Sequence, residues 1–303
     1  MTILGNCTHV SLALALRKSG LFSWVQSLAL YTLPAEHRAA KAAELADADC
    51  ILTLDLNGHF GPLATKTLRS LYPGKVTSVP TPFFSGLLPD MTYLRQTGQT
   101  GRAQGVLGDY HSALILADCQ SGLPQGQVVN RYVSGQASDR LDMLAICADS
   151  LAELQTREQG TDLAISSYIR SQMSQGLLAG QFLSFNHPTE GLINHIAQAF
   201  VTRVLGNGPQ IPPILPAEHN LYGGAHWPLH PVVAAALGLQ PQADPRFKSP
   251  NPLGARHFSI REFAQHSVQT FMDAGPQSFD IATPDYVKKH IKPLDYGPTT
   301  TTP

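Results

Sequence analysis

The first eighty residues alternate short apolar runs with longer segments of helical period. Apolar runs at 2–4, 50–56 and 75–79 have the length of buried strands. Between them, residues 10–17 and 35–46 carry apolar side chains at the spacing of one helix face. Strands that alternate with helices are typical of β-α-β units. We therefore predict an α/β fold with an N-terminal parallel-sheet core, either Rossmann-like or SGNH-like.

The pattern changes after residue 108, where apolar positions recur at helical spacing. Helices are predicted over 110–119, 125–132, 139–158, 166–178 and 191–205. Gly and Pro occur at several of the joints between them. This half of the chain is expected to form a substantial helical layer or lobe on the α/β core.

Residues 206–252 are dense in Pro and Gly and are expected to be irregular, apart from a short helix at 231–237. A last helix is predicted over 259–271. Ser259 stands at its start with Glu262 three residues later, which is the sequence signature of a capping box.

The chain has 303 residues, of which 43% are hydrophobic, enough for one large core. We predict one elaborated α/β domain over 1–296, with a sheet-rich part at 1–108 and a helix-rich part at 109–296. Residues 297–303 are too polar to pack and are expected to form a disordered tail.

Charge and cysteine usage narrow the class of protein. With 21 basic and 22 acidic residues and no dense Lys/Arg cluster, the chain lacks the signature of a nucleic-acid binder. It has neither a signal-peptide pattern at its start nor an apolar run of about 18 residues, so no membrane span is expected. Four scattered cysteines suit the reducing cytoplasm. Only 14% of residues are charged, which a homo-oligomer or a broad ligand groove would explain.

Cys7 lies in the turn between the first strand and the first helix. The unpaired N–H groups and dipole at a helix start favour the thiolate, and those N–H groups with Asn6 can stabilise an oxyanion. Gly5 permits a tight turn, and Thr8 can cap the helix. The alternative is that Cys7 is a small buried residue, the usual fate of a free cysteine.

A cysteine nucleophile needs a base, and His187 is the leading candidate. Pro188 ends the segment before it, and a helix begins soon afterwards, so the ring is expected at a sheet edge. Asn186 can orient the pair or donate to the oxyanion, and Glu190 can hold the imidazole. Four other histidines are rivals for the role of base: His9, His111, His226 and His230. For each of them, a structural hydrogen-bonding role is the alternative. The last two are spaced like metal ligands but lack a third, so no metal site is predicted.

Four segments together resemble the WcbI family of polysaccharide-biosynthesis acetyltransferases. They are Gly5-Asn6-Cys7, residues 82–90 (PFFSGLLPD), Asp109-Tyr110-His111 and residues 185–189 (FNHPT). The resemblance implies coenzyme A binding with acetyl-coenzyme A as acyl donor, a cysteine–histidine site, and acetyl transfer to a sugar hydroxyl in capsule or other surface-polysaccharide synthesis.

Carried over to this chain, the resemblance makes Cys7 the nucleophile or the thiol beside the thioester, and His187 the base. The family reads Gly-Asn-Cys-Gln, whereas Thr8 stands here, so contacts made by the glutamine are lost. A coenzyme A site also needs cations for its phosphates. The expected coenzyme A-binding residues are Gly5, Thr8, Arg95, Asp109, Tyr110, His111, Arg131 and Asn186.

The sequence leaves the reaction open in two respects. His187 can deprotonate Cys7 for a covalent route or the acceptor hydroxyl for a direct one. The same site would also suit an SGNH-like esterase with cysteine in place of serine. A third reading is a coenzyme A-binding module without catalysis.

Overall fold

The computed structural model describes residues 1–206, 208–250 and 256–294, and this part of the chain forms two compact units. The first unit comprises residues 1–84 and 151–223, and the second comprises the rest. Whether the two units count as one domain stays a prediction. The predicted disordered tail at 297–303 lies outside the described residues.

The first unit is built on a four-stranded parallel sheet in the order β2-β1-β3-β4. The strands are β2 (Gln26–Ala29), β1 (Thr2–Gly5), β3 (Ile51–Leu54) and β4 (Val76–Val79). Both central strands, β1 and β3, are buried along their whole length, as strands covered by helices on both faces must be. The predicted parallel α/β core is confirmed.

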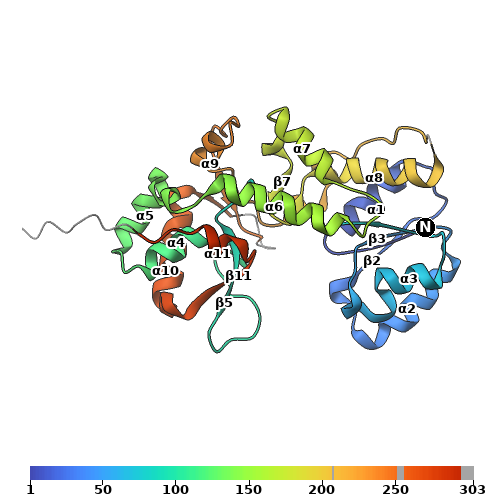
Figure 1. Cartoon of the computed structure of the whole chain (residues 1–303), viewed down its shortest axis with the longest axis horizontal. Coiled ribbons are helices and arrows are strands. Elements are labelled where there is room, and N and C mark those ends of the chain that lie inside the picture. Colours follow the sequence, from blue (N-terminus) through green and yellow to red (C-terminus); the bar gives the residue numbers. More distant parts are fainter. Residues whose placement is uncertain (207, 251–255, 295–303) are drawn as a thin grey trace, which may run out of the picture. The chain divides into compact units, whose positions relative to one another are not determined.

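Helices cover both faces of this sheet. The chain steps from β1 to β2 through α1 (His9–Lys18), then returns past β1 to β3 through α2 (Arg38–Glu44) and to β4 through α3 (Thr65–Leu71). Right-handed crossovers that run in opposite directions place α1 on one face and α2 and α3 on the other, as Figure 1 shows. The strand order reverses between β1 and β3, and ligands of α/β proteins bind at the carboxyl ends of strands beside such a reversal.

The remainder of the first unit surrounds α1. The 16-residue helix α8 (Glu190–Leu205) packs against α1 and follows a small hairpin, β7 (Phe182–Ser184) and β8 (His187–Pro188). α7 (Ser166–Ser174) precedes this hairpin, and α6 (Met143–Glu158) runs from the second unit into the first. The unit ends with two short 3-10 turns, η7 (Pro216–Glu218) and η8 (Asn220–Gly223).

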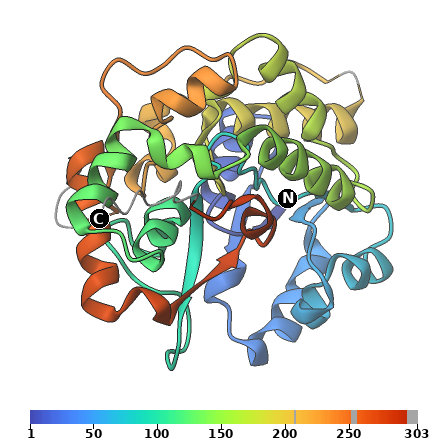
Figure 2. The same ribbon diagram turned by 60° about the vertical axis from the view of Figure 1, so that its left-hand side comes forward.

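The second unit contains an antiparallel sheet that the sequence pattern missed. Its order is β11 (Phe279–Thr283), β5 (Met91–Gln96) and β6 (Tyr110–Ser112). Although they are far apart in sequence, β5 (teal) and β11 (red) lie side by side in both views (Figures 1 and 2). Pairing between such distant segments leaves no local pattern in the sequence.

One predicted helix boundary is wrong for this reason. Residues 110–112 pair with β5 as a strand, and α4 (Ala113–Gln120) begins only afterwards. The Ser112 hydroxyl accepts the Ile115 N–H at 3.1 Å and so caps the helix. The helix predicted at 110–119 therefore begins three residues later than expected, at Ala113.

Helices and an aromatic cluster complete the second unit. α5 (Gln125–Ser134) and α10 (Ile260–Ala274) pack together, and α9 (Pro231–Ala236) and α11 (Tyr286–His290) are short. The predicted Ser259–Glu262 capping box is confirmed. Phe247 lies on β9 (Arg246–Lys248), which pairs with β10 (His257–Ser259), and stacks on Phe263 with ring centroids 3.8 Å apart. Strand β9 corrects the expectation that 206–252 is irregular apart from one helix.

Across the described residues, no helix has both the length and the apolar character needed to cross a membrane.

Candidate functional site

The Cys7 turn lies at the carboxyl end of β1, beside the point where the strand order reverses. Asn6 closes this turn. Its backbone carbonyl accepts the His9 N–H at 3.0 Å, and its side-chain Oδ1 accepts the Thr8 N–H at 3.1 Å and the Thr8 hydroxyl at 3.0 Å. Thr8 does not cap α1 with its side chain, contrary to expectation, because its hydroxyl donates back to Asn6.

This geometry changes the expected source of oxyanion donors. The backbone N–H groups of Thr8 and His9 point to Asn6, so they are not directed at a ligand. The Asn6 Oδ1 faces Thr8, and the donor end of that side chain is its Nδ2. Asn6 is therefore both the residue that shapes the turn and a side-chain donor next to Cys7.

Gly5 is needed for space rather than for an unusual backbone conformation. A Cβ at this position would lie 3.2 Å from the His9 Cβ and 3.7 Å from Leu54 Cδ1. The φ angle of Gly5 is not in the left-handed region. The first turn of α1 therefore approaches β1 more closely than a side chain would permit. The His9 ring is buried there, with Nδ1 2.6 Å from the Asn6 carbonyl oxygen.

Cys7 differs from the other three cysteines in its exposure. Cys50, Cys119 and Cys147 are buried, whereas Cys7 is half-exposed. Burial raises the pKa of all three buried thiols, that of Cys119 to about 12. A thiol reacts as its thiolate, so these three are poor nucleophiles. Cys7 is thus the cysteine that a solvent-borne reagent can reach.

His187 lies at the start of β8, directly after the turn of the small hairpin. It stands opposite Ser184 in the strand pairing, and its side chain is half-buried. Asn186 Oδ1 accepts the Ser184 hydroxyl at 3.0 Å, so this amide helps to hold the turn. The Phe185 carbonyl accepts the Phe84 N–H at 2.7 Å, which ties the hairpin to the chain that follows β4. The histidine therefore sits on a well-anchored turn.

The segments that carry Cys7 and His187 are joined by His219, which lies between η7 and η8, and by Asn220, the first residue of η8. His219 Nε2 lies 2.8 Å from the Pro188 carbonyl oxygen, and Nδ1 lies 2.5 Å from the Ser11 hydroxyl on α1. The neighbouring Asn220 donates from Nδ2 to the Cys7 carbonyl at 3.4 Å. The structure thus brings together two predicted site segments that are 180 residues apart in sequence.

Sequence reasoning missed Ser11, His219 and Asn220. The last two lie in the stretch rich in Pro and Gly, more than 200 residues from Cys7, and no spacing connects them to it. Tyr222 was also missed, and its hydroxyl donates to Glu190 Oε2 at 2.9 Å. The only local signal for this part of the site was the dipeptide His219-Asn220, which is too short to be a specific motif.

The other predicted coenzyme A-binding residues fall in the second unit. Asp109 forms an ion pair with Arg102 at 2.7 Å, and Tyr110 stacks on Tyr93 with ring centroids 5.3 Å apart. His111 is 3% exposed, its Nε2 lies 3.1 Å from the Ala103 carbonyl oxygen, and burial lowers its pKa. These contacts give His111 the environment of a core residue.

The two predicted phosphate-binding arginines have different surroundings. Arg95 on β5 is exposed and stands opposite Asp280 in the strand pairing. Arg131 Nε contacts Asp118 Oδ2 at 2.9 Å, and Arg140 contacts the other oxygen of the same carboxylate at 2.6 Å. The charge of Arg131 is therefore already matched within the protein, whereas that of Arg95 faces solvent.

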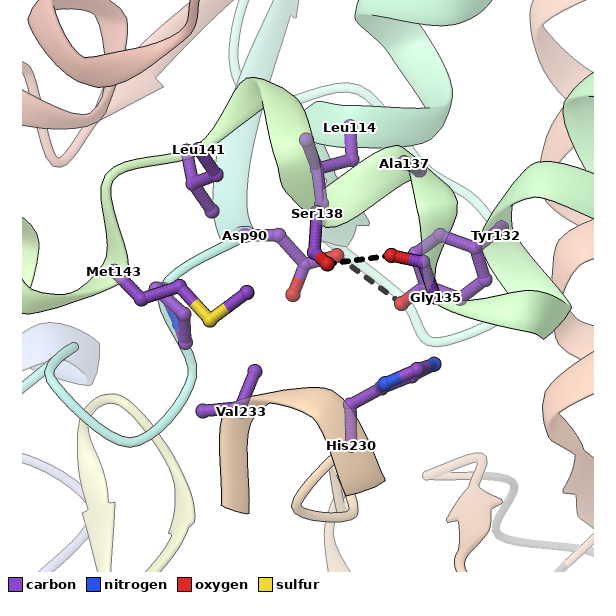
Figure 3. A pocket seen from close by; sticks show the side chains of 11 residues that line it. Asp90, Leu114, Tyr132, Gly135, Ala137, Ser138, Leu141, Met143, His230 and Val233 are labelled. Atoms are coloured by element: carbon purple, nitrogen blue, oxygen red, sulfur yellow. Dashed lines mark hydrogen bonds between the residues drawn. The ribbon is translucent and has the colours of Figure 1, made fainter. Parts of the chain in front are cut away.

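The second unit also holds a small, mostly apolar cavity to which a few polar side chains contribute (Figure 3). Asp90 Oδ2 accepts the Ser112 hydroxyl at 2.7 Å and the Tyr132 hydroxyl at 3.1 Å. His230, the residue before α9, packs against the Tyr132 ring with ring centroids 5.6 Å apart. Burial raises the pKa of Asp90 and lowers that of His230. The cavity measures about 20 Å³, enough for about one water molecule and too small for a substrate.

No group of three or more His, Cys, Asp or Glu side chains that could hold a metal ion occurs within 1–206, 208–250 and 256–294.

The family model described as polysaccharide biosynthesis enzyme WcbI matches residues 1–209, about two thirds of the chain. The chain belongs to this family. The family match covers the Cys7 turn, the His187 hairpin and α8, and it ends before η7. The last third of the chain, which includes η7 and η8, lies outside the family match.

A solved structure of WcbI is similar over nearly the whole chain. The TM-score is 0.74 at 17% sequence identity, and the match covers 96% of this chain and 92% of the other. That protein is described as a novel polysaccharide biosynthesis enzyme, in a native form without a disulfide bond between coenzyme A and one of its cysteines. At this identity the similarity shows that the fold is shared. Among curated proteins, none matches the chain.

Proposed function

We propose that this WcbI-family chain is an acyltransferase that moves an acetyl or other acyl group from coenzyme A to a hydroxyl of a sugar or polysaccharide precursor. Cys7 and His187 are the proposed catalytic residues, with Asn6 as a donor to the oxyanion. The observation that carries the proposal is the half-exposed Cys7 thiol at the strand-order reversal, joined through His219 and Asn220 to the His187 segment.

The comparisons support the choice of donor. The family is one of polysaccharide biosynthesis enzymes. The similar WcbI structure is described as a native form without a disulfide bond between coenzyme A and a cysteine. A cysteine near the sulfur of coenzyme A is well placed to meet a thioester carbonyl. The proposed acceptor is a carbohydrate hydroxyl because polysaccharides offer hydroxyl groups in quantity.

In the covalent route, His187 takes the proton of the Cys7 thiol as the sulfur attacks the thioester carbonyl. The tetrahedral oxyanion accepts a hydrogen bond from Asn6 Nδ2. The bond from carbon to the coenzyme A sulfur then breaks, and coenzyme A leaves as its thiol with the proton from His187. The acceptor hydroxyl next loses its proton to His187, attacks the acyl group and releases Cys7, which regains a proton.

In the direct route, His187 takes the proton of the acceptor hydroxyl, whose oxygen attacks the thioester carbonyl itself. Coenzyme A again leaves as a thiol, and Cys7 only helps to position the thioester. The two routes differ in one measurable species, the acyl group on Cys7.

Mixing the protein with acetyl-coenzyme A in the absence of acceptor tests the covalent route. Intact-mass and peptide mass spectrometry should find one acetyl group on Cys7 in the wild type. Asn6→Ala should slow its formation, and His187→Ala should slow it further. The Cys147→Ala variant is the matched control, because Cys147 is buried and should not carry the label.

A titration with coenzyme A in wild type, Cys7→Ala and His187→Ala tests the donor. Saturable binding in all three, with turnover only in the wild type, is the expected result. No binding of coenzyme A to the wild type would overturn the proposal. Hydrolysis of simple acyl esters without coenzyme A would favour the esterase, and binding without turnover of any acceptor would favour the binding module.

A further inference from the structure

Residues 216–223 contact both proposed catalytic segments, and we call them the clamp segment. Glu218 forms an ion pair with Lys18 of α1 at 2.7 Å, and Tyr222 donates to Glu190 in the first turn of α8 at 2.9 Å. His219 and Asn220 lie between these two anchors. The clamp segment therefore bridges α1, which begins after Cys7, and α8, which begins after His187.

His219 makes the central contacts of the clamp segment. The ring is 3% exposed, and it uses both nitrogens, Nε2 toward the Pro188 carbonyl and Nδ1 toward Ser11. A carbonyl only accepts hydrogen bonds, so Nε2 of the neutral ring carries the proton and donates it to Pro188, while Nδ1 contacts the Ser11 hydroxyl oxygen. Burial lowers the pKa of His219, which favours this neutral ring at neutral pH.

Ser11 and Asn220 extend the contacts to the Cys7 turn. Ser11 is fully buried in the first turn of α1, four residues after Cys7. Its hydroxyl donates to Asn220 Oδ1 and also contacts His219 Nδ1, and Asn220 Nδ2 donates to the Cys7 carbonyl. A continuous series of hydrogen-bonded groups therefore runs from the carbonyl of Cys7 to the carbonyl that follows His187.

We propose that His219 is a positioning residue that, with Asn220, fixes the Cys7 turn and the His187 strand at the separation which lets the two side chains act together. This inference rests on the proposed Cys7–His187 site. His219 itself contacts neither the acyl group nor the acceptor in the proposed reaction. The effect of His219 and Asn220 passes through two backbone carbonyls, that of Pro188, which follows His187, and that of Cys7.

The pH dependence of Cys7 alkylation by iodoacetamide tests this inference without acyl donor or acceptor. Alkylation reports the thiolate of Cys7, because the other three thiols are buried with raised pKa. If His187 supports the thiolate, His187→Ala should raise the midpoint of the profile. His219→Ala should raise it in the same direction and slow alkylation at pH 7 by about 10-fold, equivalent to one pKa unit.

Two isosteric variants separate the contacts of His219. Gln places its amide near the position of Nε2, so His219→Gln should keep the bond to Pro188, whereas His219→Asn should keep the one to Ser11. Both should restore part of the alkylation rate lost in His219→Ala. Asn220 is exposed, so Asn220→Ala should fold and should shift the midpoint by less than His219→Ala. It serves as the test if His219→Ala does not fold.

His195→Ala is the matched control. His195 is a half-buried histidine of α8 that stacks on Tyr168 with ring centroids 4.3 Å apart. Its loss should lower the melting temperature without moving the alkylation midpoint. A double variant, His187→Ala with His219→Ala, should shift the midpoint no further than His187→Ala does, because His219 acts through His187.

The outcomes distinguish the inference from the proposed function. If His187→Ala shifts the midpoint and neither His219→Ala nor Asn220→Ala does, the positioning role is overturned and the Cys7–His187 site stands. If His187→Ala leaves the midpoint unchanged, the proposed site is overturned, and the positioning role fails with it. If His195→Ala shifts the alkylation midpoint as much as His219→Ala does, the effect of His219→Ala is explained by a general loss of stability. That result also overturns the inference.

Discussion

The two units use the same kinds of side chain for different ends. In the first unit, Cys7 is half-exposed and His187 is half-buried. His219 and Asn220 hold their segments through the backbone carbonyls of Pro188 and Cys7, not through the two side chains. In the second unit, Asp118 is fully buried and contacts two arginines, and Cys119 beside it is buried with a raised pKa. A titratable group surrounded by its own ion-pair partners stabilises the fold, whereas one left accessible on a fixed backbone is available for chemistry.

The largest expected effect concerns Cys7. Cys7→Ala should lower acyl transfer by about 10³-fold or more, because the nucleophile is lost. Its unfolding free energy should stay close to that of the wild type, since the side chain is half-exposed. Steady-state kinetics and urea unfolding measure the two quantities. Full activity in Cys7→Ala would remove the distinction between the two units, while Cys147→Ala should keep activity and lose stability.

Asp118→Asn should have the largest effect on stability. It removes the charge that matches Arg131 and Arg140, of which Arg140 is only 8% exposed at its side chain. An uncompensated buried charge costs about 3–5 kcal/mol of unfolding free energy, measurable by urea denaturation. Asp162→Asn is the control, because its partners Arg69 and Arg203 are 40% and 49% exposed. A similar loss in both variants would contradict the importance of burial.

Acid should destabilise the protein through its buried histidines, by less than Asp118→Asn does. Burial lowers the pKa of His111 in the folded state, whereas the unfolded chain titrates near the ordinary value of about 6.5. Below that pH the unfolded chain binds protons that the folded chain does not, so the unfolding free energy falls as pH falls.

His111→Gln should therefore lose less stability between pH 7.5 and pH 5.5 than the wild type loses. Urea unfolding at the two pH values measures the difference. The exposed His257 provides a control, since His257→Gln should keep the wild-type pH dependence. An unchanged pH dependence in His111→Gln would show that the ring is not held neutral.

The smallest effect is expected at Asp90, in the same unit as Asp118. Burial raises the pKa of Asp90, so its ionised form is costly at neutral pH. An asparagine oxygen can still accept the hydrogen bonds from Ser112 and Tyr132. Asp90→Asn should change the unfolding free energy by no more than about 1 kcal/mol at pH 7. A loss as large as that of Asp118→Asn would show that His230 requires the Asp90 charge.

The sequence by itself determined the elements whose pattern is local. Apolar runs and helical spacing located three of the four strands of the parallel sheet, β1, β3 and β4, together with α1, α8 and the capping box at Ser259. The position of Cys7 between a strand and a helix was equally local, and the joint motifs led to the WcbI family, which the family match confirms. These features follow from side-chain periods of 2 and 3.6 residues and from short motifs.

Only the tertiary structure decided the features that depend on distant partners. The antiparallel pairing of β5 with β11 joins residues about 190 positions apart, and nothing near either strand announces it. The Thr8 side chain does not cap α1 as expected, because its hydroxyl donates to Asn6 Oδ1. The clamp segment reaches Cys7 and Pro188 from a stretch that reads as irregular. Hydrogen bonds between remote segments are set by three-dimensional packing, so the surroundings of Cys7 became visible only in the folded chain.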